Sequence, residues 1–244
     1  MSLSNYFSSE NKLLICAASS IEMNAFLSGA GRELCAEDMS GWRTIHFEKY
    51  SVLQTGIGKS NAAGSVAIEL RNALAEKRTY SAVLNIGIAG ALSSELSKGM
   101  SILSDSMILA DEGTPLAGSP AWRSLEDGGF AINKFVCQRT EWWQFLSKIV
   151  DAVGPIATIS TISGTAELAR SYVDRSSAIA EGMEGASIAL VCAHFGVDCA
   201  ELRAISNICG NSNREENPWD FPAALNKLSE LGASIVERHS AKTL

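Results

Sequence analysis

Short apolar runs rich in β-branched residues alternate along the chain with longer segments of helical period. This alternation is typical of an α/β protein whose sheet is largely buried. The sequence therefore predicts an α/β fold with strands at Lys12–Ala17, Val52–Thr55, Ala82–Ile86, Ser101–Leu109, Ile156–Ile162 and Glu201–Ile205.

Three segments have the spacing of helices that bury one face against a sheet. In the first, apolar residues recur at steps of three and four, as a single buried helix face requires. These residues are Ala62, Ala63, Val66, Ala67, Leu70 and Leu74. The same spacing predicts two further helices, at Gly185–Phe195 and Pro222–Val236.

Two other segments predict irregular structure. Pro115, Pro120 and the pair Gly128-Gly129 interrupt the region from about 111 to 133, and Asn211–Pro218 forms the second segment. Because long loops often border a binding site, both segments are candidates for contact with a ligand.

Composition narrows the class of ligand. The chain has 244 residues, 46% of them hydrophobic, with no change in composition that would mark a boundary, so residues 1–244 are expected to form one domain. The net charge of −7 argues against nucleic acid or an anionic membrane as a partner, because both require a basic face. A small-molecule ligand is the expectation.

The cysteines and the N-terminal residues suggest a cellular location. Six cysteines stand far apart with no C-x-x-C pair, which predicts reduced and mostly buried thiols rather than a metal site: Cys16, Cys35, Cys137, Cys192, Cys199 and Cys209. The N-terminal residues lack a basic and apolar signal region, and no apolar run approaches the roughly 18 residues that span a bilayer. We expect a soluble, cytoplasmic protein.

Two glycine-rich segments resemble nucleotide-binding motifs only in part. Gly56-Ile57-Gly58-Lys59-Ser60 looks like the end of a phosphate-binding loop, but Leu53 stands where that motif requires glycine. Asn61 likewise stands where a dinucleotide fingerprint requires its third glycine. The segment therefore predicts a tight strand-to-helix turn with Lys59 in solvent.

The second glycine-rich segment, Asn85–Gly90, follows an apolar strand and predicts another turn. Its small residues allow either close approach of the backbone to a ligand or close packing of a helix on the sheet. The residues alone do not decide between these two interpretations.

Carboxylates and amides are the main candidates for chemistry. Only three histidines occur, and His194 lies in an apolar helical stretch that favours a structural role; no Ser or Cys has nucleophile-elbow spacing. Glu22, Glu184 and Asn207 each follow an apolar strand, where open α/β sheets bind ligands. By spacing alone, each could equally be a helix cap or a surface group.

Taken together, six segments resemble the nucleoside phosphorylase superfamily, and keep its order over nearly the whole chain: Ala18–Glu22, Thr55–Ala63, Asn85–Gly90, Ser163–Thr165, Glu181–Ala186 and Arg203–Asn207. Within it, the chain is similar to methylthioadenosine/S-adenosylhomocysteine nucleosidases and to futalosine hydrolases, the latter through Ala110–Pro115, Asn207 and the loop from Arg214 to Trp219. The resemblance implies a three-layer α/β/α sandwich around a mixed sheet that curls toward a barrel, in a homodimer or larger homo-oligomer. It implies no metal or organic cofactor.

The resemblance also implies roles in the cleavage of a purine nucleoside. Glu22 matches the general base that activates water, and Glu184 matches the carboxylate that accepts hydrogen bonds from both ribose hydroxyls. Met183 matches a residue that packs on the ribose, although ordinary core filling would explain it equally. The turn Ile88-Ala89-Gly90 is expected to contact the substrate.

Two departures from phosphorylases favour water as the nucleophile. Glu22 occupies the position that hydrolytic members use, and a carboxylate repels phosphate. Ile88 stands where relatives often have Ser or Thr, and it supplies no hydroxyl. Hydrolysis is therefore expected rather than phosphorolysis.

Asn207 bears on the choice of base. Adenine-specific nucleosidases carry Asp there, whereas an amide NH₂ can donate to N7 and to the oxygen of a 6-oxopurine. Hypoxanthine is then the expected leaving base and futalosine, an inosine-type nucleoside with a keto-linked benzoate, the expected substrate. Arg214 and Trp219 are candidates for binding the benzoate, and Ser206 and Arg203 for orienting Asn207; Arg203 could equally be a structural ion-pair partner.

Two other functions remain open at this point. A methylthioadenosine/S-adenosylhomocysteine or aminofutalosine nucleosidase would release adenine. A nucleoside-binding or storage protein with the same fold would release no base, although the presence of both Glu22 and Glu184 argues against it.

Overall fold

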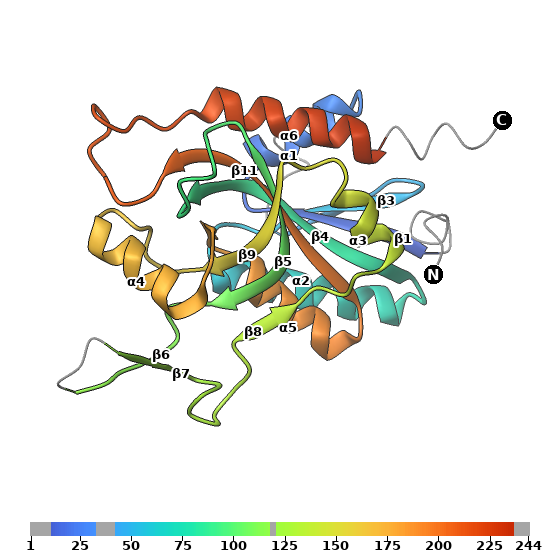
Figure 1. Ribbon diagram of the computed structural model, residues 1–244. Coiled ribbons are helices and arrows are strands. Elements are labelled where there is room, and N and C mark those ends of the chain that lie inside the picture. Colours follow the sequence, from blue (N-terminus) through green and yellow to red (C-terminus); the bar gives the residue numbers. More distant parts are fainter. Residues whose placement is uncertain (1–10, 33–41, 118–120, 237–244) are drawn as a thin grey trace.

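The computed structural model describes residues 11–32, 42–117 and 121–236 (Figure 1). The elements within these residues, in chain order, are β1 (Asn11–Ala17), α1 (Ser20–Gly29), β2 (Thr44–His46), β3 (Tyr50–Gln54), α2 (Lys59–Ala75), β4 (Thr79–Ala91), β5 (Ser101–Leu109), β6 (Gly113–Pro115), β7 (Trp122–Ser124), β8 (Lys134–Val136), α3 (Glu141–Leu146), β9 (Ala152–Thr158), α4 (Ala166–Ser176), β10 (Ala180–Gly182), α5 (Gly185–Phe195), β11 (Asp198–Ile208) and α6 (Phe221–Val236).

The central sheet is mixed and partly closed. Its strand order is β10-β9-β5-β11-β4-β1-β3-β2, with β8 beside β5. Strand β10 is parallel to β9 and also pairs antiparallel with β4, through Glu181 opposite Gly90. Because of this second pairing, β4, β11, β5, β9 and β10 form a closed ring. The expected curl of the sheet toward a barrel is confirmed.

Helices cover both faces of the sheet. In Figure 1, α1 and α6 lie on one face, and α2 and α5 lie on the other. Strand β1 shows why the sequence folds this way: Leu13 and Ile15 pack on the side of α1 and α6, whereas Leu14 and Cys16 pack on the side of α2. A strand buried on both faces needs a continuous apolar run rather than an alternating one. The α/β class and the three-layer arrangement are confirmed.

Several element boundaries agree closely with the sequence patterns. Strand β5 and helix α5 have the predicted bounds, and β1 and α6 each begin one residue earlier than predicted. Strand β9 ends at Thr158 rather than Ile162, so the apolar residues that follow belong to a loop. The predicted irregular region after Asp111 contains the short hairpin of β6 and β7.

The predicted turn at Asn85–Gly90 is wrong, because β4 continues through it to Ala91. Pairing with β1, β11 and β10 satisfies the backbone over this stretch, so the glycines mark close approach of side chains and not a change of direction. A Cβ on Gly87 would lie 2.2 Å from the Arg203 guanidinium and 2.7 Å from Glu22 Oε1. The described residues contain no helix that is both long and apolar enough to cross a membrane.

Helices α1 and α6 approach each other through glycine. A Cβ on Gly232 would lie 1.7 Å from the Phe26 carbonyl oxygen, and a Cβ on Gly29 would lie 1.7 Å from the Ser229 carbonyl oxygen. The two helices must therefore separate if either glycine gains a side chain. Because α1 carries Glu22, this helix contact also sets the position of a candidate site residue.

We predict that Gly232→Ala lowers the free energy of unfolding by about 1–3 kcal/mol, the usual cost of adding atoms to a close contact. Urea titration followed by circular dichroism measures this change. Ser234→Ala, at an exposed position of the same helix, should alter stability by only about 0.5 kcal/mol. Equal stability of Gly232→Ala and the wild-type protein would contradict the close contact between α1 and α6.

Candidate active site

A cavity of about 510 Å³ opens at the carboxyl ends of β1, β4 and β11, which run parallel to one another. This is where α/β sheets place their ligands. The lining residues come from β4, β10 and β11, from the segments at the starts of α1, α2, α5 and α6, and from the loop after β9: Ala18, Ser19, Ile21, Glu22, Ile57, Ile88, Ala89, Gly90, Ile159, Ile162, Glu181, Gly182, Met183, Glu184, Arg203, Ser206, Asn207, Trp219, Phe221 and Leu225. Its wall is mostly apolar, with a few polar groups.

Glu22 is both a helix-capping residue and a lining residue. In the capping box of α1, Ser19 Oγ accepts from the backbone N–H of Glu22, and the Ser19 N–H donates to Glu22 Oε2 at 3.0 Å. Glu22 Oε1 accepts from the Ile88 N–H at 2.9 Å. The carboxylate is therefore held from two sides at the positive end of the α1 dipole.

Glu184 is held in a similar way at the start of α5. Its Oε1 accepts from the Gly58 N–H at 2.9 Å, and its Oε2 forms an ion pair with Arg203 at 2.8 Å. Met183 donates its backbone N–H to the same Oε2 at 3.3 Å. Each carboxylate oxygen can accept more than one hydrogen bond, so Glu184 keeps capacity for a ligand.

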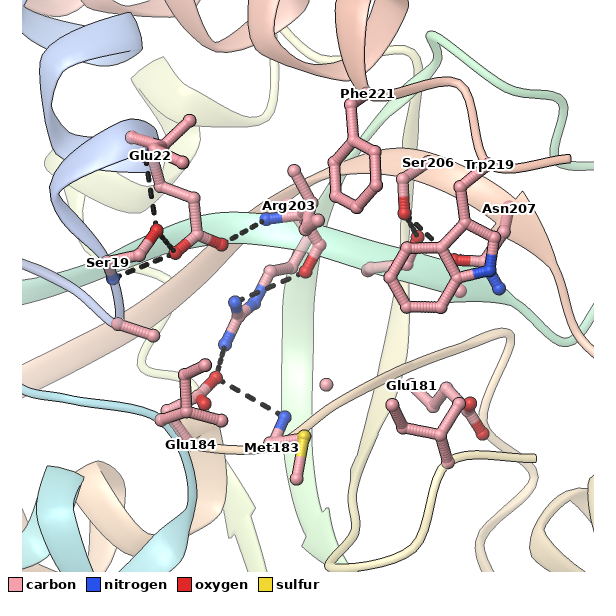
Figure 2. A pocket seen from close by; sticks show the side chains of 18 of the residues that line it. Ser19, Glu22, Glu181, Met183, Glu184, Arg203, Ser206, Asn207, Trp219 and Phe221 are labelled. Atoms are coloured by element: carbon pink, nitrogen blue, oxygen red, sulfur yellow. Dashed lines mark hydrogen bonds and ion pairs between the residues drawn. The ribbon is translucent and has the colours of Figure 1, made fainter. Parts of the chain in front are cut away.

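Arg203 lies between these carboxylates, as Figure 2 shows. Its guanidinium is only 1% exposed and also pairs with Glu201, with 2.7 Å between Nε and Oε1. Burial alone would lower the pKa of Arg203, but Glu201, Glu184 and Glu22 outweigh it and raise that pKa. Burial raises the pKa of the Glu201 carboxyl, against the opposing effect of Arg203. Of the two roles expected for Arg203, the ion pair is observed; the contacts of its side chain do not include Asn207.

Asn207 lies at the other end of the cavity. It follows an irregularity in the pairing of β11 with β4, between Ile205 and Asn207. The Ser206 hydroxyl lies within hydrogen-bond distance of Asn207 Oδ1, at 2.8 Å. The Ser206 hydroxyl also lies 3.2 Å from the Ala89 carbonyl oxygen. The contact with Ser206 engages the amide oxygen, and the NH₂ group can donate to a ligand. Ser206 thus has the position expected of a residue that orients Asn207.

The loop before α6 forms the outer wall. Trp219 lines the cavity, and its buried indole N–H has no hydrogen-bond partner among the described residues. Arg214 is exposed and lies outside the cavity, with its guanidinium carbon 4.2 Å from the centre of a Trp219 ring. Both residues, with Pro218 and Phe221, line an adjoining hollow of about 440 Å³. Of the predicted site residues, Arg214 is thus outside the cavity and contacts it through Trp219.

Glu181 is a lining residue that the sequence patterns did not single out. Its carboxyl is 3% exposed and accepts from the Ser163 N–H at 3.0 Å and from the Ser163 hydroxyl. Burial raises the pKa of Glu181, and the hydrogen bonds from Ser163 oppose the shift. A Cβ on Gly90 would lie 3.1 Å from Asn207 Nδ2 and 3.3 Å from Glu181 Cγ, which places these two side chains on either side of that glycine.

The sequence patterns also missed most of the apolar wall: Ile21, Ile57, Ile159, Ile162, Phe221 and Leu225. Ile57 and Ile162 are more than two-fifths exposed, so neither belongs to a buried periodic face. The sequence offered one signal for this wall, the isoleucine between two glycines at position 57.

One prediction about an individual residue is wrong. Lys59 is not in solvent: its side chain is 15% exposed and forms ion pairs with Asp111 and, at 3.0 Å, with Glu112. His194, expected to be structural rather than catalytic, is exposed in the last turn of α5 and lies outside the cavity.

The cysteines that can be checked agree with the expectation. Cys16, Cys137 and Cys192 are buried free thiols, Cys199 and Cys209 are half-buried free thiols, and Cys35 lies outside the described residues. Burial is the largest cause of the raised pKa of Cys16 and Cys137.

The chain belongs to the phosphorylase superfamily, whose model matches residues 12–239. It is similar to two proteins named futalosine hydrolase. The one from Streptomyces coelicolor is 30% identical, with 89% of this chain and 92% of that protein covered. The one from Thermus thermophilus is 33% identical, with 77% and 81% covered. A solved structure of futalosine hydrolase from Helicobacter pylori has the same fold, with a TM-score of 0.67, 20% identity, and 96% and 99% of the two chains covered.

We predict that Glu181→Gln changes the pH dependence of stability in a defined direction. Because the pKa of Glu181 in the folded protein lies above the ordinary value of 4.5, its stabilising contribution is complete below that pH and is lost as the pH rises. Glutamine does not titrate. The stability of wild type minus that of the variant should therefore fall as the pH rises from about 4.5.

Urea unfolding of both proteins across this pH range measures the difference. A constant offset between the curves, with no dependence on pH, would reflect only the changed hydrogen bonds with Ser163 and would contradict the raised pKa of Glu181.

Proposed function

We propose that this protein is an N-glycosidase that hydrolyses futalosine to hypoxanthine and dehypoxanthine futalosine. One observation carries the proposal: Glu22, Glu184 and Asn207, from three separate elements, line the same mostly apolar cavity. The similarity to futalosine hydrolases over most of the chain supports it.

Glu22 is the proposed general base. Loss of a purine passes through a ribose that carries positive charge, and an activated water must reach the opposite face of the sugar. The contacts with Ser19 and Ile88 fix the Glu22 carboxylate at the cavity wall, where it can orient and deprotonate that water. Glu184 accepts hydrogen bonds from the ribose hydroxyls, and Met183 packs beside the sugar.

The charge of the cavity favours water over phosphate as nucleophile. Arg203 is the one cationic side chain among the described lining residues, and its guanidinium is already paired with Glu184 and Glu201. Glu22, Glu181 and Glu184 add three acidic groups to the same wall. A phosphate dianion here would meet repulsion with no free cation to offset it, whereas water carries no such cost.

Asn207 is the proposed base-recognition residue. With its oxygen in contact with Ser206, its NH₂ group can donate to purine N7 and to the oxygen of a 6-oxopurine. An adenine base would instead present an amino group to these donors. We infer a preference for hypoxanthine over adenine.

The outer wall suits the benzoate of futalosine. Trp219 and Phe221 offer aromatic surface, and Arg214 lies beyond them where it can reach the carboxylate of an extended substituent. Ile88, Ala89 and Gly90 form the stretch of wall between Glu22 and Asn207, since Ile88 donates its N–H to Glu22 and Gly90 pairs with Asn207. By this proposal the protein acts in menaquinone biosynthesis, in the cytoplasm and as a homo-oligomer.

Base release from futalosine, aminofutalosine and methylthioadenosine tests the proposal. Hypoxanthine should form from futalosine at the same rate with and without phosphate, as chromatography would show. Glu22→Gln should lower kcat by about 10²–10⁴-fold, because glutamine cannot take a proton from water. Glutamine also suits the capping box, so the variant should fold.

Three other results would contradict the proposal. Release of adenine from methylthioadenosine in preference to any release from futalosine would favour the nucleosidase interpretation. A requirement for phosphate would show phosphorolysis. No release from any of the three, with binding retained in both wild type and Glu22→Gln, would favour a binding or storage protein.

We predict that Asn207→Asp shifts the base preference toward adenine. A protonated carboxyl can donate to N7 while its other oxygen accepts from the 6-amino group. The ratio of kcat/KM for futalosine to that for aminofutalosine should fall by roughly two orders of magnitude. Asn72→Asp, an isosteric change on the exposed face of α2, should leave the ratio unchanged. An unchanged ratio in Asn207→Asp would remove Asn207 from base recognition.

A further inference from the structure

The position of the Glu184 carboxylate depends on the turn that precedes α2. Gly58, the N-cap of α2, has a φ of 90° and no side chain, and its N–H donates to Glu184 Oε1 at 2.9 Å. Any movement of this turn therefore moves a hydrogen-bond donor of Glu184. Ile57, in the same turn, lines the cavity.

The residue after Gly58 is tied to a distant segment. Lys59 Nζ forms ion pairs with Asp111 and Glu112, which follow β5, and only 15% of the lysine side chain is exposed. Asp111 also accepts the Ser160 N–H at 2.6 Å through its other oxygen. Asp111 thus joins the turn before α2 to the loop after β9, which carries Ile159.

These contacts form a closed circuit around Glu184. At the end of β9, Thr158 Oγ1 accepts the Ala186 N–H at 2.8 Å, in the first turn of α5 and two residues from Glu184. The circuit runs from Glu184 to the turn before α2, through Asp111 to the loop after β9, and back to the start of α5. Figure 2 shows Glu184 at the cavity wall. Within this circuit, the Asp111 side chain links the turn before α2 to the loop after β9.

Lys59 stands where its charge needs compensation. It is the first residue of α2, at the positive end of the helix dipole, and the first turn of α2 contains no acidic residue. A cation here destabilises the helix unless negative charge lies nearby. Asp111 and Glu112 supply that charge from another part of the chain.

We propose that Asp111 is a positioning residue for ribose recognition: it acts through Lys59 and Gly58 to hold Glu184 in the orientation that accepts both ribose hydroxyls. This inference rests on the ribose-binding role proposed above for Glu184. It assigns to the segment after β5 a part in substrate binding, although the cavity lining contains neither Asp111 nor Lys59.

The sugar supplies a test that separates positioning from general support. A substrate with a 2′-hydroxyl gains from a well-oriented Glu184, whereas its 2′-deoxy analogue lacks one of the two hydrogen bonds. Loss of positioning should therefore reduce the preference for the ribonucleoside. A general weakening of the fold would slow both substrates equally.

The variants are Asp111→Asn and Lys59→Met, assayed with futalosine and 2′-deoxyfutalosine. Asparagine keeps an oxygen for the Ser160 N–H but removes the Asp111 charge, so that Lys59 keeps only Glu112, which does not contact the loop after β9. In both variants the ratio of kcat/KM, ribo over 2′-deoxy, should fall about tenfold, less than the loss expected from a 1 Å misplacement. The change should be mainly in KM, and the double variant should lose little more than either single one.

A matched pair elsewhere in the fold provides the control. Asp151 accepts the Ser101 N–H at 2.8 Å and lies 3.6 Å from Lys227 Nζ, so it joins a backbone N–H and a lysine as Asp111 does. Neither residue lines the cavity. Asp151→Asn and Lys227→Met should leave the ratio unchanged, even if urea unfolding shows lower stability.

An equal loss for both substrates in Asp111→Asn, or no loss for either, would overturn the inference. A wild-type enzyme without preference for the ribonucleoside would overturn it together with the role of Glu184. If the wild type cleaves methylthioadenosine and not futalosine, the proposed substrate fails. The ratio measured with methylthioadenosine and its 2′-deoxy analogue then still decides the role of Asp111.

Discussion

The arrangement of the cavity depends on the buried guanidinium of Arg203. This cation is almost fully removed from water. It forms ion pairs with Glu184 and Glu201 and interacts electrostatically with Glu22. Leaving a buried carboxylate without such a partner costs several kcal/mol, roughly 3–5 when an existing pair is broken. Arg203 therefore makes it possible to keep acidic groups at the end of an apolar cavity.

Three glycines near the cavity leave room for Arg203 and its partner Glu201. A Cβ on Gly87 would overlap the guanidinium, one on Gly185 would lie 1.9 Å from Glu201 Oε2, and one on Gly182 would lie 3.3 Å from Arg203. These glycines belong to β4, β10 and the start of α5, which are far apart in the sequence. The charged cluster thus dictates backbone composition in three elements, and the backbone leaves the cluster little freedom to move.

How far the sequence predicts the structure depends on whether a signal is local. Strand β5 and helix α5 have their predicted bounds because each is an uninterrupted apolar or periodic segment, and Gly196 ends α5 with a φ of 67°. The failures at Gly87 and Lys59 have a common cause. A glycine in the sequence indicates that space is needed but not which side chain fills that space. Asp111, the ion-pair partner of Lys59, lies 52 residues away in the sequence. Interactions over such separations leave no pattern in a single sequence.

The candidate site shows the same limit. Spacing alone did not decide whether Glu22 and Glu184 are helix caps or functional groups. For Glu22 the two roles are compatible, because it caps α1 and also lines the cavity. Their place after apolar strands made Glu184 and Asn207 candidates, and the resemblance to a family assigned their roles. Glu181 stood in the segment Glu181–Ala186 without a role of its own, and Phe221 stood in no motif. They became candidates only when the fold placed them beside the others.

The two ends of the cavity differ in how firmly they are held, and this difference bears on specificity. Glu22 and Glu184, the carboxylates proposed to act at the ribose, are held by strands of the closed ring, by helix starts and by Arg203, so a change there disturbs the whole fold. Arg214 and Trp219 belong to a loop, and the guanidinium of Arg214 contacts the outer face of Trp219 in solvent. Substitutions in such a loop cost little stability. A substitution in this loop can therefore change the outer wall of the cavity while the charged cluster around Arg203 stays intact.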